Sequence, residues 1–297
     1  MDLSGLTEIA VKAALDAGKV IQSYSGRKVE VMHKEGKDSL ASQVVTEVDG
    51  KAQDAILGRL LPSCRDLGIA LLTEESEDDL SRFTQDFFWC IDPMDGTLPF
   101  VEGRPGYSVS VALVAQDGSP QIGVVYDPVR EVLYQATKGQ GMQRNGKPWK
   151  LEPKAKVLTC HYDLSFEGHP AFGKVMDELG QYARSCGLEG LAASQNGGAV
   201  INACHALENA PGCYFKFPKK EEGGCSIWDY AATACLYQEA EAIVSDVWGK
   251  PLDLNRPDST YMNHGGSIYA TDADLAKEIQ SMGEAGCDFL SFESRPR

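Results

Sequence analysis

Residues 87–97 read Phe-Phe-Trp-Cys-Ile-Asp-Pro-Met-Asp-Gly-Thr. The first five are apolar and predict a buried strand, and the end of a buried strand is a common place for ligand-binding residues. Pro93 restricts the backbone, so Asp92 and Asp95 can face a common point while the carbonyl oxygen of Met94 stays free. Asp-Pro and Asp-Gly are also typical of plain surface turns. If the segment binds a metal, its oxygen ligands favour Mg²⁺ or Mn²⁺ over Zn²⁺.

A second acidic pair, Glu74-Glu75, follows another strand-like segment earlier in the chain. Carboxylates that two strands bring to one place repel one another unless a cation lies between them, so the sequence predicts a divalent metal site. Gly96-Thr97 adds a backbone that can approach a ligand closely and a hydroxyl that can hold water or an anion. Metal and anion together indicate phosphate chemistry. Glu75 is also the first residue of an acidic run that ends at Asp79, and such a run can simply be a solvated surface segment.

Composition limits the class of protein. The 297 residues include 43% hydrophobic and 24% charged residues, which is ordinary for a globular protein of one large domain or two packed halves. A net charge of −15 disfavours a nucleic acid polymer or an anionic membrane as partner. No apolar stretch is long enough to span a bilayer and no signal peptide is recognisable, so a cytoplasmic location is expected. The nine cysteines show no C-x-x-C spacing and are expected to be mostly reduced core residues.

Hydrophobic periodicity predicts an α+β first half and an α/β second half, with a soft boundary near residue 155 that separates 1–155 from 156–297. The first half is expected to hold a helix pair and an antiparallel-looking sheet, with helices at 4–24 and from 46 to about 62, and strands at 68–72, 87–91, 107–115, 121–126 and 132–137. Asn145-Gly146 predicts a hairpin tip. The second half is expected to hold helices at 171–184, 197–208, 228–240 and 272–283 and a strand at 242–247.

Asp229 lies in the first turn of the predicted helix at 228–240, where an acid can serve the helix dipole alone. The ordered motifs change that interpretation, because together they resemble the inositol monophosphatase superfamily of magnesium-dependent, lithium-sensitive phosphatases. The likeness covers nearly the whole chain. It is carried by Thr46-x-x-Asp49, Glu74-Glu75-Ser76, Trp89-x-Ile91-Asp92-Pro93-Met94-Asp95-Gly96-Thr97-x-x-Phe100, Gly123-Val124-Val125-Tyr126-Asp127-Pro128, Trp228-Asp229-x-Ala231-Ala232 and Gly249-Lys250-Pro251-Leu252-Asp253.

The resemblance implies a layered αβαβα sandwich and a site for two or three Mg²⁺ ions. The implied metal ligands are Glu74, Asp92, Asp95 and Asp229 with the carbonyl oxygen of Met94. The implied catalytic residues are Glu74 and Thr97, which would orient and deprotonate the attacking water, and Asp49, which with Lys34 matches the loop that seats a further metal. Glu75 and Lys34 would lie just behind the ligands.

The resemblance also implies a substrate side. Phosphate oxygens would meet Gly96 and Thr97 beside Asp95 and Asp229, and the alcohol would meet Asn196, Gly197, Gly198 and Glu222. This sequence departs from the family pattern at Thr73, at Leu98-Pro99 and at Glu241-Ala242, although no proposed metal ligand is lost. The segment from Asn196 to Trp228 carries three extra cations, Lys216, Lys219 and Lys220, which are similar to those of nucleotidases or belong to a solvated loop.

We therefore expect a metal-dependent phosphomonoesterase that hydrolyses a small phosphorylated polyol such as inositol 1-phosphate with metal-activated water. A 3′(2′),5′-bisphosphate nucleotidase acting on adenosine 3′,5′-bisphosphate is the main alternative, followed by a histidinol-phosphate or sugar-bisphosphate phosphatase. A non-catalytic regulatory protein on the same fold is the alternative from another class. The resemblance further implies a homodimer.

Overall fold

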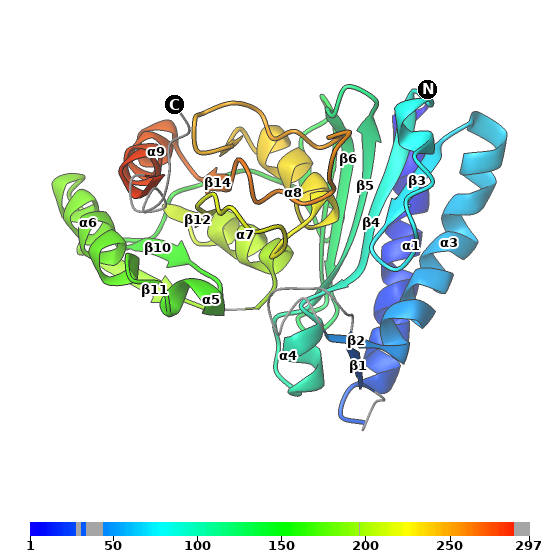
Figure 1. Cartoon of the computed structure of the whole chain (residues 1–297), viewed down its shortest axis with the longest axis horizontal. Coiled ribbons are helices and arrows are strands. Elements are labelled where there is room, and N and C mark those ends of the chain that lie inside the picture. The colour runs from blue at the N-terminus through cyan, green and yellow to red at the C-terminus, as the bar shows by residue number, and fades with distance from the viewer. Residues whose placement is uncertain (28–30, 34–43, 196, 288–297) are drawn as a thin grey trace.

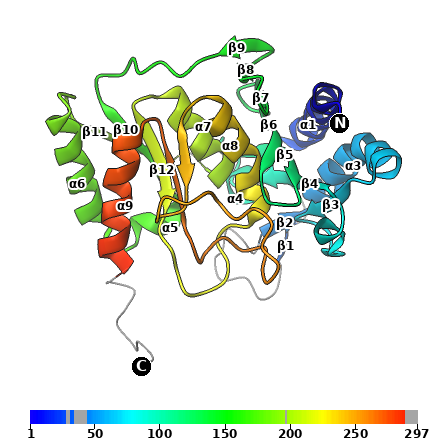
Figure 2. The same cartoon turned by 90° about the horizontal axis from the view of Figure 1, so that it is seen from above.

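The computed structural model describes residues 1–27, 31–33, 44–195 and 197–287. Its elements form five layers, which Figures 1 and 2 show from two directions. The helix pair α1 and α3 covers one face of a seven-stranded sheet, α7 and α8 lie between this sheet and a five-stranded sheet, and α6 and α9 cover the outer face of the latter. The predicted layered αβαβα sandwich is therefore confirmed.

The helices follow the predicted hydrophobic periods closely. Ala10, Ala14, Ala17 and Ile21 lie on one face of α1 and are fully buried. The helical segments are α1 Leu3–Tyr24, α3 Glu47–Leu67, η1 Ser81–Phe83, α4 Thr97–Val101, α5 Leu164–Glu167, α6 Phe172–Ser185, α7 Ala199–Glu208, α8 Ile227–Glu239 and α9 Ala273–Cys287. Each of the six helices expected from the sequence is present, with ends that shift by a few residues.

One predicted helix end is wrong, because α3 continues past Pro62 to Leu67. Proline removes its own N–H and its ring crowds the carbonyl of the preceding turn, but a side chain from outside the helix bonds to the residue after it. The indole N–H of Trp89 donates to the hydroxyl of Ser63 at 3.0 Å, and Ser63 is buried. The helix ends instead at Gly68, which adopts the left-handed conformation at φ 65°.

The larger sheet has the order β3-β4-β5-β6-β7-β8-β9. Its strands are β3 Ala70–Thr73, β4 Phe87–Asp95, β5 Ser108–Ala115, β6 Pro120–Asp127, β7 Val132–Thr137, β8 Met142–Arg144 and β9 Lys147–Trp149. The expected antiparallel pairing holds from β4 onward, whereas β3 and β4 are parallel. The predicted hairpin at Asn145-Gly146 is confirmed as the β8–β9 connection.

The smaller sheet has the order β11-β10-β12-β14-β13. Hydrophobic periodicity predicted only one of its five strands. Its strands are β10 Leu158–His161, β11 Leu191–Ser194, β12 Gly212–Lys216, β13 Ile243–Ser245 and β14 Ser267–Ala270. Only β13 matches an expected strand. The two short strands β1 Val31–His33 and β2 Val44–Thr46 pair separately. The change of sheet falls between β9 and β10, while the division into two domains at residue 155 stays a prediction.

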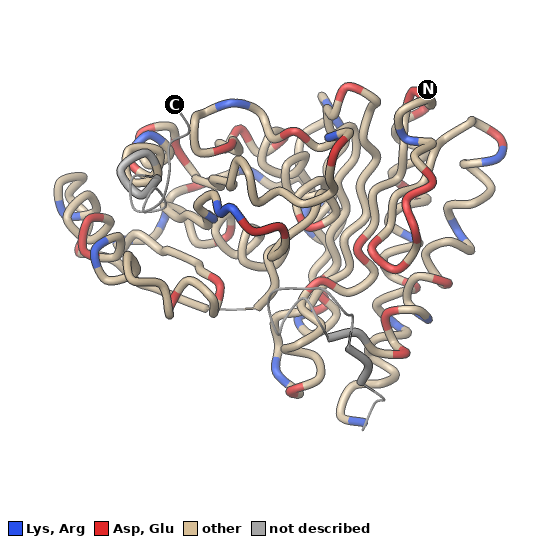
Figure 3. The backbone as a smooth tube through the Cα atoms, in the orientation of Figure 1, with Lys and Arg blue, Asp and Glu red and all other residues tan. Residues whose placement is uncertain are grey.

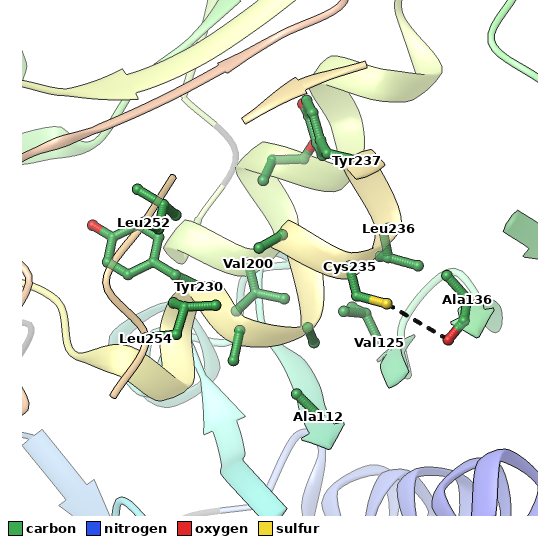
Figure 4. Packing of buried hydrophobic residues seen from close by; sticks show 14 of the residues in the cluster. Ala112, Val125, Ala136, Val200, Tyr230, Cys235, Leu236, Tyr237, Leu252 and Leu254 are labelled. Atoms are coloured by element: carbon green, nitrogen blue, oxygen red, sulfur yellow. Dashed lines mark hydrogen bonds between the residues drawn. The ribbon is translucent and has the colours of Figure 1, made fainter. Parts of the chain in front are cut away.

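Helix α8 packs closely against the larger sheet, and Figure 4 shows part of this buried cluster. A Cβ atom on Gly123 of β6 would lie 2.2 Å from the carbonyl oxygen of Ala232 in α8, so only glycine allows this approach. Nearby, the thiol of Cys235 donates a long 3.9 Å hydrogen bond to the carbonyl oxygen of Ala136. This close contact fixes the position of α8, whose first turn carries Asp229.

Two expectations from composition can be compared with the described residues. The eight cysteines whose side chains are described are free, and five of them are buried, as expected for reduced core residues. None of the helices within the described ranges combines the length and the apolar character that crossing a bilayer requires.

Candidate active site

Parallel pairing of β3 and β4 brings the first two acidic residues together. Thr73 lies opposite Ile91 in the ladder, and the backbone N–H of Glu74 donates to the carbonyl oxygen of Ile91 at 3.1 Å. Both strands therefore end at the same edge of the sheet. Glu74 follows one strand there, and Asp92 lies beside it near the end of the other.

Three aspartates from two distant parts of the chain meet at this edge. Carboxylate oxygens of Asp92, Asp95 and Asp229 all lie within 4.8 Å of one another. The β4–β5 pairing shifts register between Asp92 and Asp95, and such an irregularity re-aims side chains that a regular strand would point to opposite faces. Asp229 arrives from the first turn of α8.

Backbone N–H groups hold each of the three carboxylates. Asp92 accepts from the N–H of Met94 at 2.9 Å. Asp95 accepts from two N–H groups of the first turn of α7, at 3.2 and 3.0 Å. Asp229 accepts from the N–H of Ser226 at 2.6 Å in a capping box. These bonds fix the orientation of the carboxylates before any ligand arrives.

Burial and mutual repulsion work against the charges of these groups. Burial and then the neighbouring charges of Glu74, Asp229 and Asp95 hold the pKa of Asp92 well above its ordinary value. Burial and the charge of Asp229 likewise raise the pKa of Asp95. Burial, followed by the charge of Glu74, raises the pKa of Asp229 to about 6. Without a cation, the ionised forms of these three carboxylates are therefore unfavourable, because they are removed from water and repel one another.

This donor set fits a hard divalent cation. All of its donor atoms are carboxylate or carbonyl oxygens, the ligand type that Mg²⁺ and Mn²⁺ prefer. A bound cation would offset the repulsion that raises the three pKa values. The chemistry of the donors therefore supports a metal site, and it leaves the identity of the metal to experiment.

Thr97 and Asp49 form a hydrogen-bonded pair beside the carboxylates. The Thr97 hydroxyl lies 3.0 Å from Oδ1 of Asp49 and 3.1 Å from the carbonyl oxygen of Met94, and its single proton serves one of them at a time. Asp49 is buried, and its other oxygen accepts from the N–H and the hydroxyl of Thr46, both at 2.7 Å. Burial raises the pKa of Asp49 although the Thr46 hydrogen bonds oppose it.

Glycines let three backbone segments meet at the site. A Cβ atom on Gly197 would lie 2.0 Å from the carbonyl oxygen of Gly106, and one on Gly198 would lie 2.1 Å from Oδ2 of Asp95. Gly197 also has a φ of 147°, and Gly96 one of 86°. These contacts explain why a glycine directly precedes α7, whose first N–H groups donate to Asp95, and why a glycine precedes α4.

A cavity of about 480 Å³ opens over these groups. It contains most of the residues expected from the sequence. Those that line it are Glu74, Asp92, Met94, Asp95, Gly96, Thr97, Gly197, Gly198 and Asp229. Asp49 lies behind Thr97 and reaches the cavity through the threonine hydroxyl.

Four expected residues are not gathered at the cavity. Glu222 is exposed and is not among the lining residues, and partly buried Glu75 is also absent from the lining. Lys34 and Asn196 lie outside the described residues. The roles expected for these four residues stay predictions.

Sequence reasoning missed one ion pair in the cavity wall. Nζ of Lys216, at the end of β12, lies 2.5 Å from Oδ2 of Asp163, which precedes α5. The hydroxyl of Tyr214 also donates to Asp163 at 3.1 Å. The charge of Asp163 holds the pKa of Lys216 well above its usual value although burial opposes it. In the sequence Lys216 is one of three extra cations of its segment, and no spacing pattern connects it with Asp163.

Comparison with known proteins agrees with this geometry. A family model described as "Inositol monophosphatase family" matches residues 2–283. The inositol-1-monophosphatase of Synechocystis sp. is 33% identical over 284 residues, which cover 94% of this chain and 88% of the relative. The Nus factor SuhB of Escherichia coli strain K12 is 31% identical over 255 residues, which cover 82% of this chain and 86% of the relative.

A solved structure shows the same fold. The inositol monophosphatase II of Staphylococcus aureus MSSA476 superposes with a TM-score of 0.72 at 22% identity, over 97% of this chain and 99% of its own. The match of the family model spans both sheets and every carboxylate of the cavity. The chain belongs to the inositol monophosphatase family.

Proposed function

We propose that this protein is a magnesium-dependent phosphomonoesterase that acts on small phosphate esters. The observation that supports it most is the meeting of three buried or partly buried aspartates within 4.8 Å, beside the Thr97–Asp49 pair, in one cavity. Phosphatase activity is typical of the family to which the chain belongs. The metal ligands in this proposal are Glu74, Asp92, Asp95 and Asp229 with the carbonyl oxygen of Met94.

The protein groups in this proposal have separate tasks. Two or three Mg²⁺ ions would stabilise the negative charge on the entering and leaving oxygens when bound. Thr97 donates its proton to Asp49, so its oxygen can accept a hydrogen bond from the attacking water and orient it. In this proposal the water gives its proton to the Thr97 oxygen while the Thr97 proton moves to Asp49, whose raised pKa makes it a stronger base, and Glu74 assists from the end of the neighbouring strand β3.

The phosphate and its alcohol occupy different sides of the cavity in this proposal. Thr97 begins α4 and Gly96 is its N-cap, and both line the cavity, where they would face the phosphate oxygens. Gly197 and Gly198 bound the alcohol side, where Lys216 and Lys219 also line the wall. A phosphorylated polyol such as inositol 1-phosphate is one candidate substrate, supported by the name of the Synechocystis relative. Adenosine 3′,5′-bisphosphate is the second, because the lysines can meet a second phosphate.

The decisive experiment measures phosphate release from a substrate panel with and without Mg²⁺. The panel contains inositol 1-phosphate, adenosine 3′,5′-bisphosphate, histidinol phosphate and fructose 1,6-bisphosphate. Asp92→Asn should remove activity, whereas Asp127→Asn should keep it. Asp127 is a matched control, since it is a buried aspartate of the same sheet whose Oδ1 accepts from two backbone N–H groups, and an asparagine oxygen can still accept both. Turnover that is independent of Mg²⁺ would refute the proposal.

A regulatory role is the competing function. The E. coli relative carries the name of a Nus factor, a class that differs from a metabolic phosphatase. The presence of all the proposed ligands and of the Thr97–Asp49 pair favours catalysis for this chain. Absence of turnover with every ester of the panel would favour the regulatory role.

Two further properties are proposed on the resemblance alone. We expect a homodimer in the cytoplasm, and size-exclusion chromatography with light scattering measures the first. Inhibition by millimolar lithium at saturating Mg²⁺ tests the lithium sensitivity of the family.

A further inference from the structure

A second cavity, of about 260 Å³, lies next to the 480 Å³ cavity of the candidate active site. We call it the aromatic cavity. Six residues line both cavities: Asp163, Ser165, Lys216, Lys219, Gly224 and Cys225. The two cavities are therefore neighbours with part of their lining in common.

Aromatic and other apolar side chains make up much of the lining that this cavity does not share, together with the polar residues His169, Lys174, Glu178 and Asn263. The rings of Phe166, Phe215 and Phe217 form a cluster, with centroids 5.7, 6.0 and 5.0 Å apart in the pairs 166–215, 166–217 and 215–217. The remaining apolar lining consists of Ala171, Val175, Pro218, Met262 and Met282. Phe166 and Phe217 are only partly buried, so their rings retain surface that a ligand can cover.

The walls of the aromatic cavity are held in place by the backbone. A Cβ atom on Gly266 would lie 2.3 Å from the carbonyl oxygen of Lys216, so the loop before β14 packs directly on the end of β12. The N–H of Lys219 donates to the carbonyl oxygen of Asn263 at 2.9 Å, and Nδ2 of Asn263 donates to that of Lys219 at 3.1 Å. In Figure 3 the loop that follows β12 carries a blue segment followed directly by a red one. The cavity thus exists before a ligand arrives.

Charge is concentrated in the lining that the two cavities share. Lys216 pairs with Asp163 there and also donates to the sulfur of Cys225 at 2.7 Å. This shared lining suits the polar part of an alcohol, and the aromatic rings beyond it suit an apolar part. Where the ligand contacts the phenylalanine rings, the hydroxyls of a bare polyol would lose water without gaining a partner, whereas an aromatic ring would bury apolar surface.

We infer that the aromatic cavity binds an aromatic ring carried by the alcohol portion of the phosphate ester. The inference rests on the proposed function and specifies its substrate class. The phosphate lies at the carboxylates, a polar spacer passes Lys216 and Asp163, and the ring contacts Phe166 and Phe217. A nucleobase and a simple phenyl group are two sources of such a ring.

Matched pairs of esters test the ring alone. Adenosine 5′-monophosphate is compared with ribose 5-phosphate, and 2-phenylethyl phosphate is compared with ethyl phosphate. Values of kcat/KM at saturating Mg²⁺ should favour a ring-bearing ester at least tenfold over its ring-free partner. A preference in the first set only would identify a nucleobase, and one in the second set would identify a phenyl group. Equal values in both sets would overturn the inference.

Two phenylalanine variants assign the preference to this cavity. Phe217→Ala should reduce the kcat/KM preference for the ring-bearing ester to less than threefold, mainly by raising the KM of that ester. Phe172→Ala is the matched control, because the ring of Phe172 lies 5.4 Å from that of Phe166 and 5.1 Å from that of Tyr162 but does not line the cavity. It should keep the full preference. A preference that survives in Phe217→Ala, or disappears equally in both variants, contradicts the assignment.

Calorimetry separates failure of this inference from failure of the proposed function. Binding of adenosine 5′-monophosphate and of ribose 5-phosphate to the Mg²⁺-loaded protein needs no turnover. Tighter binding of the ring-bearing ester that Phe217→Ala removes would support the ring site even if no ester were hydrolysed. Hydrolysis of every ester with equal binding of both would uphold the phosphatase and exclude the ring site.

Discussion

The hydroxyl of Thr97 lies 3.0 Å from Oδ1 of Asp49, although 48 residues separate them. Thr97 begins α4 at the end of the larger sheet, and Asp49 lies in the first turn of α3. The Asp49 carboxylate also caps its own helix through Thr46. One buried acid thus holds a helix end and receives the proton of a cavity hydroxyl, so its replacement should affect both stability and turnover.

Replacement of the Thr97 hydroxyl separates these two effects. Thr97→Val keeps the shape of the side chain but cannot orient water, so we expect kcat to fall about 10²- to 10⁴-fold with little change in KM. Thr97→Ser retains the hydroxyl and should recover most of the rate. Steady-state kinetics on the best ester of the panel measures both. A valine variant with the wild-type kcat would exclude Thr97 from the reaction.

Magnesium should stabilise the folded protein because it offsets the repulsion among Asp92, Asp95 and Asp229. At a concentration one hundred times the dissociation constant, a single bound ion adds about 2.7 kcal/mol to the free energy of unfolding. Thermal or urea unfolding with and without Mg²⁺ measures this gain. Asp92→Asn should show a much smaller gain and should be at least as stable as the wild type without metal, since it lacks one of the repelling charges. Asp127→Asn should respond to Mg²⁺ like the wild type.

Acid should destabilise the fold through His161. Burial, with a contribution from neighbouring His205, lowers the pKa of His161 from 6.5 to about 4. The imidazole of His161 therefore binds a proton near pH 6.5 in the unfolded chain but stays neutral in the folded protein. The free energy of unfolding falls as the pH drops from 6.5 toward 4. Between pH 7.5 and pH 5 the loss from this residue is about 2 kcal/mol. Urea unfolding at both pH values should show a smaller loss in His161→Gln, and an equal loss in the two proteins would contradict the assignment.

Close packing of α8 on the larger sheet should make Gly123 intolerant of a side chain. A Cβ atom there would lie 2.2 Å from the carbonyl oxygen of Ala232, so Gly123→Ala should cost about 1–3 kcal/mol of unfolding free energy. Gly173→Ala is the control, because a Cβ atom on this helical glycine meets nothing within 4 Å. It should be neutral or stabilising by up to about 1 kcal/mol, since alanine favours helix. Chemical denaturation compares the two.

The amino-acid sequence alone determined the elements whose residues carry a strong local period. The buried face of α1 and the apolar run of β4 are visible as spacings, because helices and strands repeat their side chains every 3.6 and 2 residues. The motif residues Glu74, Asp92 and Asp95 were likewise predicted to converge, since acids at the ends of strand-like runs repel one another unless they bind a cation. The cavity contains all three.

Only the tertiary structure decided the features that depend on contacts between distant residues. Helix α3 continues past Pro62 because Trp89 bonds to Ser63 from another element, and Lys216 is a wall residue because Asp163 lies 2.5 Å away. The strands of the smaller sheet are short, and their partners come from far along the chain. The aromatic cavity likewise exists only where α6, α9 and β12 meet. A local window of sequence holds no information about such contacts, since their energies arise from packing and not from periodicity.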